Sequence, residues 1–130
     1  MALASVGPID ELAFCGPDLL VGAQAGGALA VWDLRDGRVH LVTARPSSAQ
    51  ALASAPGAAL LAQARYDGAV VLWGPDPAGG LRALASVDLA PEGDLPVGVA
   101  FSEEPALRLL VLGARGRLHV YSVKLSGDPR

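Results

Sequence analysis

The amino-acid sequence predicts an all-β protein built from three copies of a unit of antiparallel strands. Its apolar segments are short and are bounded by turns rich in Gly, Pro and Asp, a pattern typical of strands rather than helices. An aromatic residue (Trp32, Trp73 or Tyr121) follows a glycine-containing turn in three places, at intervals of about 40 to 50 residues. We therefore expect three repeated units along the chain.

The first unit is predicted to span residues 7–43 and to contain four strands. Gly7-Pro8 precedes the first strand, Gly16-Pro17-Asp18 separates it from the second, and Gly26-Gly27 separates the second from the third. Asp36-Gly37 lies between two apolar runs, which is a strong hairpin signal. The four predicted strands are residues 9–14, 19–23, 28–32 and 39–43.

The second unit is predicted to span residues 48–87 in the same order. Residues 47–64 are rich in Ala, Leu and Gln, so a helix is the alternative in this part. Pro56-Gly57 would break that helix in its middle, and two strands are favoured instead. Tyr66-Asp67-Gly68 then makes a tight turn. The four predicted strands are residues 48–54, 58–64, 69–73 and 81–87.

The third unit is predicted to span residues 97–123 and to contain only three strands, residues 97–102, 108–113 and 117–123. A short polar tail follows Val123, so the unit has no fourth strand of its own. The sequence Ala-Leu-Ala-Ser-Val at residues 2–6 recurs at residues 83–87, the predicted outer strand of the second unit. Residues 2–6 are therefore a candidate outer strand for an incomplete unit, and chance identity in an Ala-rich sequence is the alternative.

These repeats resemble the WD-repeat family of β-propellers over essentially the whole chain. Trp32-Asp33 is the dipeptide that gives the family its name, and Tyr66-Asp67-Gly68 leading to Trp73 is similar to the family's turn before the third strand. The resemblance implies propeller blades of four antiparallel strands, with the aromatic residue of the third strand packed between blades. It gives structural roles to Trp32, Asp33, Asp67, Gly68, Trp73 and Tyr121.

The chain departs from the family pattern at the polar positions. The Gly-His dipeptide before the first strand is absent from all three units, because His40 and His119 fall within predicted strands. Of the turn acids only Asp67 is kept, while Gly26 and Arg115 occupy the other two positions. We expect the family's hydrogen-bonded set of His, Ser or Thr, Asp and Trp to be broken, and the blades to depend on apolar packing.

Three blades do not close a ring, since propellers normally have about four to eight. Three arrangements remain open. Two copies could form a six-bladed ring in which each N-terminal strand completes a blade of the other chain, the blades could dock on a partner's incomplete propeller, or the chain could be a piece of a longer protein. In each case exposed strand edges and apolar blade faces require a protein partner.

Charge and composition exclude several function classes. The net charge is −3 and the basic residues are scattered singly, which argues against nucleic acid or an anionic membrane as the main partner. The sequence contains no phosphate-binding loop, nucleophile elbow or metal-binding His and Cys cluster, so we expect no enzymatic activity, no metal and no cofactor. Adjacent acids at Asp10-Glu11 and Glu103-Glu104 would point to opposite faces of a strand.

The single cysteine and the N-terminus bear on location. Cys15 is expected to be a small buried hydrophobic residue, and the lack of a disulfide framework fits a reducing compartment. The N-terminus has no basic leader, and no apolar run approaches the roughly 20 residues of a membrane helix. These features predict a cytoplasmic or nuclear protein.

The resemblance also implies a binding surface. WD-repeat proteins commonly bind partners with the loops that join second to third strands and that lead from one blade to the next. In this chain those loops carry Gln24, Arg45, Arg65, Tyr66 and Arg115. Arg and Tyr are favoured at interface hot spots, so an acidic peptide is an expected ligand, with solvent-facing loop residues as the alternative.

The sequence thus predicts a non-catalytic interaction module, a scaffold or an adaptor in a larger assembly. The alternatives are a small-ligand-binding or hydrolytic β-protein that uses a central channel, and a structural fragment of a longer protein.

Overall fold

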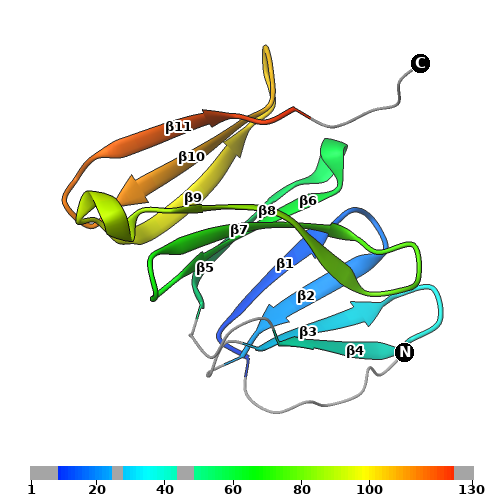
Figure 1. Ribbon diagram of the computed structural model, residues 1–130. Helices are drawn as coiled ribbons and strands as arrows, with labels where there is room; N and C mark the ends of the chain where they lie inside the picture. Colours follow the sequence, from blue (N-terminus) through cyan, green and yellow to red (C-terminus); the bar gives the residue numbers. More distant parts are fainter. Residues whose placement is uncertain (1–8, 25–27, 44–48, 125–130) are drawn as a thin grey trace.

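The computed structural model describes residues 9–24, 28–43 and 49–124 of the 130-residue chain (Figure 1). Within those residues every regular element is a β-strand, apart from two short 3-10 turns at Pro56–Ala58 and Ala90–Glu92. The predicted all-β class is therefore confirmed. Residues 2–6, the candidate closing strand, and Arg45 lie outside the described part of the chain.

The strands form three antiparallel sheets in which each strand pairs with its neighbours in sequence. Blade 1 contains β1 (Glu11–Cys15), β2 (Leu19–Ala23), β3 (Ala28–Asp33) and β4 (Val39–Thr43). Blade 2 contains β5 (Ala49–Ala55), β6 (Leu60–Arg65), β7 (Ala69–Pro75) and β8 (Leu81–Asp88). Blade 3 contains β9 (Pro96–Ser102), β10 (Arg108–Gly113) and β11 (Leu118–Ser122).

The strands begin and end where the turn residues of the sequence place them. Of the helix considered for residues 47–64, the described residues 49–64 instead form β5 and β6, with Pro56 and Gly57 in a 3-10 turn between them. Gly37 and Gly68 adopt φ values of +74° and +100°, which L side chains rarely adopt, and so allow the tight turns after β3 and β6. Blade 3 has three strands, and among the described residues none pairs with the outer edge of β11.

The three blades are equivalent in register. Trp32 pairs with Leu20, Trp73 with Leu61 and Tyr121 with Leu109, so each aromatic residue occupies the same place in its blade. Because side chains alternate across a strand, each blade has two faces. We call the face that carries Trp32, Trp73 or Tyr121 the aromatic face, and the other the aliphatic face.

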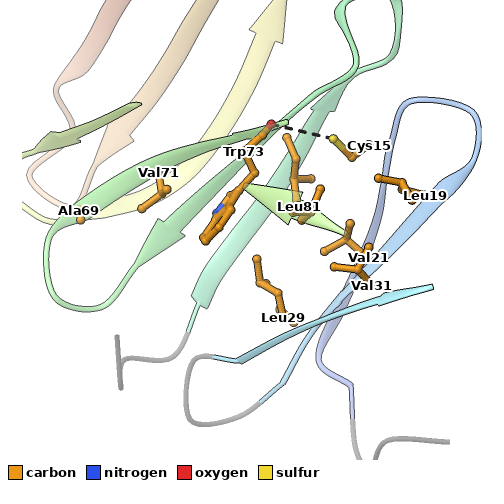
Figure 2. Close-up of a cluster of buried hydrophobic side chains, with 11 residues drawn as sticks. Cys15, Leu19, Val21, Leu29, Val31, Ala69, Val71, Trp73 and Leu81 are labelled. Carbon is orange, nitrogen blue, oxygen red and sulfur yellow. Dashed lines mark hydrogen bonds between the residues drawn. The ribbon is translucent and has the colours of Figure 1, made fainter. Parts of the chain in front are cut away.

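The blades pack in a row, with blade 2 between blade 1 and blade 3 and with the first strands β1, β5 and β9 next to one another (Figure 1). Between blades 1 and 2, Val21 and Leu29 on the aliphatic face of blade 1 pack against Trp73 on the aromatic face of blade 2 (Figure 2). Between blades 2 and 3, Val70 on the aliphatic face of blade 2 packs in one cluster with Tyr121. Both interfaces therefore join an aliphatic face to an aromatic face.

Cys15 lies in the first of these interfaces. Its side chain is buried, and Sγ is 3.5 Å from the carbonyl oxygen of Ala59 and 3.9 Å from that of Trp73. Burial raises the pKa of the Cys15 thiol to about 11, because the low-dielectric interior disfavours the thiolate. The expectation of a small buried hydrophobic residue agrees with this position.

Candidate functional site

Several loops leave the three blades at one end, because neighbouring strands are antiparallel. We call this end the loop face; its described residues are Gln24, residues 66–68, residues 89–95 and residues 114–117. The segment between β8 and β9 connects two of its turns. The N–H of Leu89 donates to the carbonyl of Gly68 at 2.9 Å, and the N–H of Ala114 donates to the carbonyl of Leu95 at 2.8 Å. The turns that carry Tyr66 and Arg115 are thus held by a common segment.

Arg65 is buried inside blade 2 rather than exposed on the loop face. Its Nε donates to Asp67 Oδ2 at 3.2 Å, while Asp67 Oδ1 accepts the N–H of Ala69 at 3.1 Å. These contacts fix the β6–β7 turn, whose Tyr66 side chain is exposed. The sequence indicated an exposed loop arginine at this position. In the structure Arg65 is buried and stabilises the turn that carries Tyr66 through its contact with Asp67.

Arg115 lies exposed on the β10–β11 turn, as the sequence indicated. Its guanidinium Nη1 is 3.5 Å from the carbonyl oxygen of Gly93, at the edge of hydrogen-bond range. Arg117, on the same turn, is also exposed, so this turn presents two cations to solvent. Gln24 lies at the end of β2, where its N–H donates to the carbonyl of Ala28 at 3.0 Å.

A buried carboxylate holds the turns of blade 3 together. Asp94, in the β8–β9 segment, accepts the N–H groups of Leu95 at 2.9 Å and Arg115 at 3.2 Å, and its Oδ2 is 3.2 Å from His119 Nε2. Burial alone would raise the pKa of Asp94, but the hydrogen bonds from His119, Leu95 and Arg115 outweigh it and lower that pKa. A Cβ on Gly113 would overlap this carboxylate, so only glycine fits there.

Asp94 and His119 therefore form a buried polar contact in a chain whose blades were expected to depend on apolar packing. The sequence did not single out Asp94, since nothing local to an aspartate between β8 and β9 reveals a partner on β11. The available signal was Gly113, a glycine at the end of an apolar strand, which often marks a close approach of another group. His119 was placed within a predicted strand, and the structure has it on β11 with its side chain in contact with Asp94.

A second buried polar contact lies in blade 2. The indole Nε1 of Trp73 donates to Gln63 Oε1 at 3.0 Å, and both side chains are buried. Gln63 lies on β6, the second strand of the blade, so this hydrogen bond joins the second and third strands through their side chains. The blades are consequently less dependent on apolar packing alone than the sequence suggested.

Asp33 stabilises the end of blade 1 that lies opposite the loop face. Its carboxylate accepts hydrogen bonds from the Arg35 guanidinium at 2.8 and 3.0 Å and from the Arg35 N–H at 3.0 Å. The Arg35 side-chain hydrogen bond, followed by the backbone one, lowers the pKa of Asp33 to about 2. The Asp of the Trp-Asp dipeptide thus orders the β3–β4 turn.

Both ends of the row of blades expose large apolar side chains. On the aliphatic face of blade 3, Leu112, Leu118 and Val120 are 45%, 58% and 52% exposed. On the aromatic face of blade 1, Leu12, Phe14 and Leu41 are 59%, 47% and 63% exposed. Solvent-exposed apolar patches of this kind mark interaction surfaces. We call these two surfaces the end faces.

A groove of about 280 Å³ runs between the outer part of blade 2 and β11. Blade 2 contributes Val70, Leu72 and Val87 to its lining, and blade 3 contributes Leu109 and Tyr121. The groove therefore lies between the two blades, next to β8 and β11.

Among residues 9–24, 28–43 and 49–124, no group of three or more His, Cys, Asp or Glu side chains is placed to hold a metal ion. In the same part of the chain, no helix is long and apolar enough to cross a membrane.

Comparison with known proteins identifies the fold. No protein-family model matches the sequence, and no curated protein matches it significantly. The structure is similar to the C-terminal WD40 domain of Sif2, with a TM-score of 0.75 and 15% identity over 89% of this chain. It is also similar to U3-55K, with a TM-score of 0.72 and 18% identity over 92% of the chain, and to the Dos1 propeller, with a TM-score of 0.64 and 21% identity over 81%.

The chain spans only part of these structures, covering 34% of the Sif2 domain, 43% of U3-55K and 30% of the Dos1 propeller. This agrees with a row of three blades that does not close a ring. The chain has the WD40 β-propeller fold, and its described residues form three of the blades.

Proposed function

We propose that the chain is a non-catalytic protein–protein interaction module that acts as a scaffold or an adaptor in a larger assembly. One observation carries this proposal. Leu118 and Val120 are more than half exposed on blade 3, while the equivalent Leu29 and Val31 of blade 1 are buried against the next blade. Leaving such side chains in water costs free energy that contact with another protein recovers. We infer a cytoplasmic or nuclear location, which the lone buried cysteine supports.

The loop face is the second surface that we propose for binding. Tyr66 is exposed and rests on a turn fixed by Asp67, so little conformational freedom is lost when a partner packs against it. Arg115 and Arg117 place two cations on the neighbouring turn. An aromatic platform beside two arginines suits a peptide that carries Asp or Glu next to an apolar residue.

A ligand-binding or hydrolytic β-protein is the alternative from another class. Such a protein would need converging polar side chains at the starts of the innermost strands. The residues at or next to those places, Ile9, Ala49 and Val97, are apolar, which favours the interaction module. A structural fragment of a longer protein would show neither peptide binding nor specific capture of a partner.

The loop face is tested with a labelled peptide rich in Asp and Glu, titrated against the wild type and the Tyr66→Ala/Arg115→Glu variant. We expect the variant to bind at least tenfold more weakly, since both substituted side chains are exposed hot-spot types. Arg82→Glu is the matched control, because Arg82 is an exposed arginine on the outer strand β8. Equal affinities of all three proteins, or no binding by the wild type, would show that the loop face is the wrong surface.

The scaffold role is tested by affinity purification of the tagged wild type and of the same two variants, with quantitative mass spectrometry. Specific partners should be lost from the Tyr66→Ala/Arg115→Glu sample and retained by Arg82→Glu. Partners that are equally abundant in all samples would place the binding surface elsewhere.

A further inference from the structure

We propose that blade 3 binds an extended segment of another protein, which adds to β11 as a fourth strand and places apolar side chains in the groove between blades 2 and 3. The bound segment is acidic toward its N-terminus and basic toward its C-terminus. This inference rests on the proposed interaction function, and it adds a binding surface that is separate from the loop face.

The outer edge of β11 offers backbone hydrogen-bonding groups to a further strand. In blades 1 and 2 the third strands β3 and β7 pair on this side with β4 and β8, whereas among the described residues no strand pairs with β11 there. The N–H of Val123 points the other way and donates to the carbonyl of Leu107 at 3.1 Å. Because backbone groups point to alternate sides along a strand, those of Val120 and Ser122 point to the open side. An extended peptide can pair with them as an added strand.

The groove corresponds to a space that is filled between blades 1 and 2. There Leu81, on the fourth strand β8, packs in one cluster with Leu29 and Val31 of β3. Val70 and Leu72 of β7 occupy the same register positions in blade 2, and both line the groove of about 280 Å³. Among the described residues, blade 3 has no fourth strand to supply a counterpart of Leu81. An apolar side chain of a strand added to β11 would fill this space.

The two ends of the groove carry opposite charges. Lys124 is exposed and lines the groove where β11 ends, away from the loop face. Glu92 lies at the loop face in the β8–β9 segment, close enough to act on Tyr121: burial raises the pKa of the Tyr121 hydroxyl, and the charge of Glu92 raises it further. A strand antiparallel to β11 runs from the Lys124 end to the Glu92 end. Charge complementarity therefore favours Asp or Glu in its first part and Lys or Arg in its last part.

Two synthetic peptides of equal composition test the charge order. The first is acetyl-Glu-Glu-Leu-Thr-Val-Thr-Lys-Lys-amide, and the second, acetyl-Lys-Lys-Leu-Thr-Val-Thr-Glu-Glu-amide, has the charges exchanged. By fluorescence anisotropy at low ionic strength, the wild type should bind the first at least threefold more tightly, since exposed charge pairs contribute little each. The Glu92→Lys/Lys124→Glu variant should prefer the second. Equal affinities of the wild type for both peptides, an unchanged preference in the variant, or no binding would overturn the proposal.

N-methylation of the first peptide tests strand addition itself. With the peptide Leu and Val opposite Val123 and Tyr121, their side chains point into the groove and their own N–H groups point away from β11. The two Thr residues then lie opposite Ser122 and Val120 and donate to β11. We expect methylation of the two Thr nitrogens to weaken binding at least tenfold, and methylation of the Leu and Val nitrogens to leave it nearly unchanged. Equal effects of the two modifications would overturn strand addition.

A substitution in the groove locates the bound peptide. Ala85 and Ala83 are both exposed alanines on β8, and of the two only Ala85 lines the groove. Ala85→Gln places a polar side chain in the groove at an exposed position, so folding is retained while the apolar contact is lost. We expect it to bind the first peptide at least tenfold more weakly, and Ala83→Gln to bind as the wild type does. Equal affinities of the two variants would overturn the assignment to the groove.

The loop-face variant separates this proposal from the proposed function. Tyr66→Ala/Arg115→Glu leaves the groove residues unchanged, so it should bind the first peptide as tightly as the wild type does. Binding that is lost in this variant and kept by Ala85→Gln would place the peptide on the loop face, which overturns the groove and leaves the proposed function standing. Groove binding that persists while the peptide rich in Asp and Glu fails to bind would overturn only the loop face.

Discussion

Trp73→Ala removes the largest side chain that joins blade 2 to blade 1. Trp73 is 3% exposed, packs in one cluster with Val21 and Leu29 of blade 1, and donates a hydrogen bond to Gln63. Truncating a buried aromatic side chain to alanine costs about 3 to 5 kcal/mol of unfolding free energy, because a cavity remains. The loss of the donor to a buried Gln63 oxygen places the expected cost toward the upper end of that range. A typical domain has only about 5 to 15 kcal/mol in total.

Urea unfolding followed by far-ultraviolet circular dichroism measures this cost. Trp73→Phe separates the two contributions, because it keeps an aromatic ring and removes the indole donor; we expect a loss of about 1 to 3 kcal/mol. Tyr121→Ala is the comparison at the equivalent place in blade 3, and it should cost less than Trp73→Ala, since Tyr121 is only partly buried. A cost below about 1 kcal/mol for Trp73→Ala would refute the view that Trp73 couples the first two blades.

Three further predictions concern acid stability, thiol reactivity and blade 3. Arg35 lowers the pKa of Asp33 to about 2 in the folded protein, whereas an unfolded Asp has a pKa of about 3.9. The stabilisation that the Asp33 carboxylate gives the fold is therefore complete above pH 4 and is lost as the pH falls from 4 toward 2. The urea midpoint of the wild type should fall over that range, and Asp33→Asn should flatten the decline; equal slopes would contradict the Arg35 contact. Cys15, whose pKa is raised to about 11, should react slowly with iodoacetamide at neutral pH in the native protein and rapidly in urea, and a fast native reaction would show that it is accessible. Gly113→Ala should lower the thermal midpoint by several degrees, because the added Cβ displaces Asp94, whereas Gly98→Ala, whose Cβ would make an ordinary contact with Leu112, should leave it nearly unchanged. Equal midpoints for both variants would contradict the role of Asp94.

Turn chemistry made most of the strands predictable from the sequence. Residues 19–23, 39–43 and 108–113 were predicted with the bounds that the structure gives β2, β4 and β10. The spacing of Trp32, Trp73 and Tyr121 also predicted their equivalent register, because a repeated pattern of local signals is visible in one dimension. The three strands that the described residues give blade 3 followed from the same pattern.

The parts that sequence could not predict depend on contacts between distant residues. Arg65 follows an apolar strand and precedes a turn, as an exposed loop arginine would, and only the packing of blade 2 shows that it is buried. Asp94 stabilises blade 3 through its contact with His119 on β11 and fits there because Gly113 on β10 has no side chain. Both residues are distant from Asp94 in sequence. The sequence likewise did not reveal which face of each blade packs on the next blade; the apolar clusters between the blades show it.

The central claim is that blade 3 leaves an apolar face that another protein must cover. Sedimentation velocity of the purified chain at concentrations on the order of 10 µM tests this most directly. We expect species heavier than the chain mass of 13.2 kDa, which Val120→Lys should reduce to the single-chain mass. A wild type that stays at the single-chain mass and remains soluble at those concentrations would contradict it.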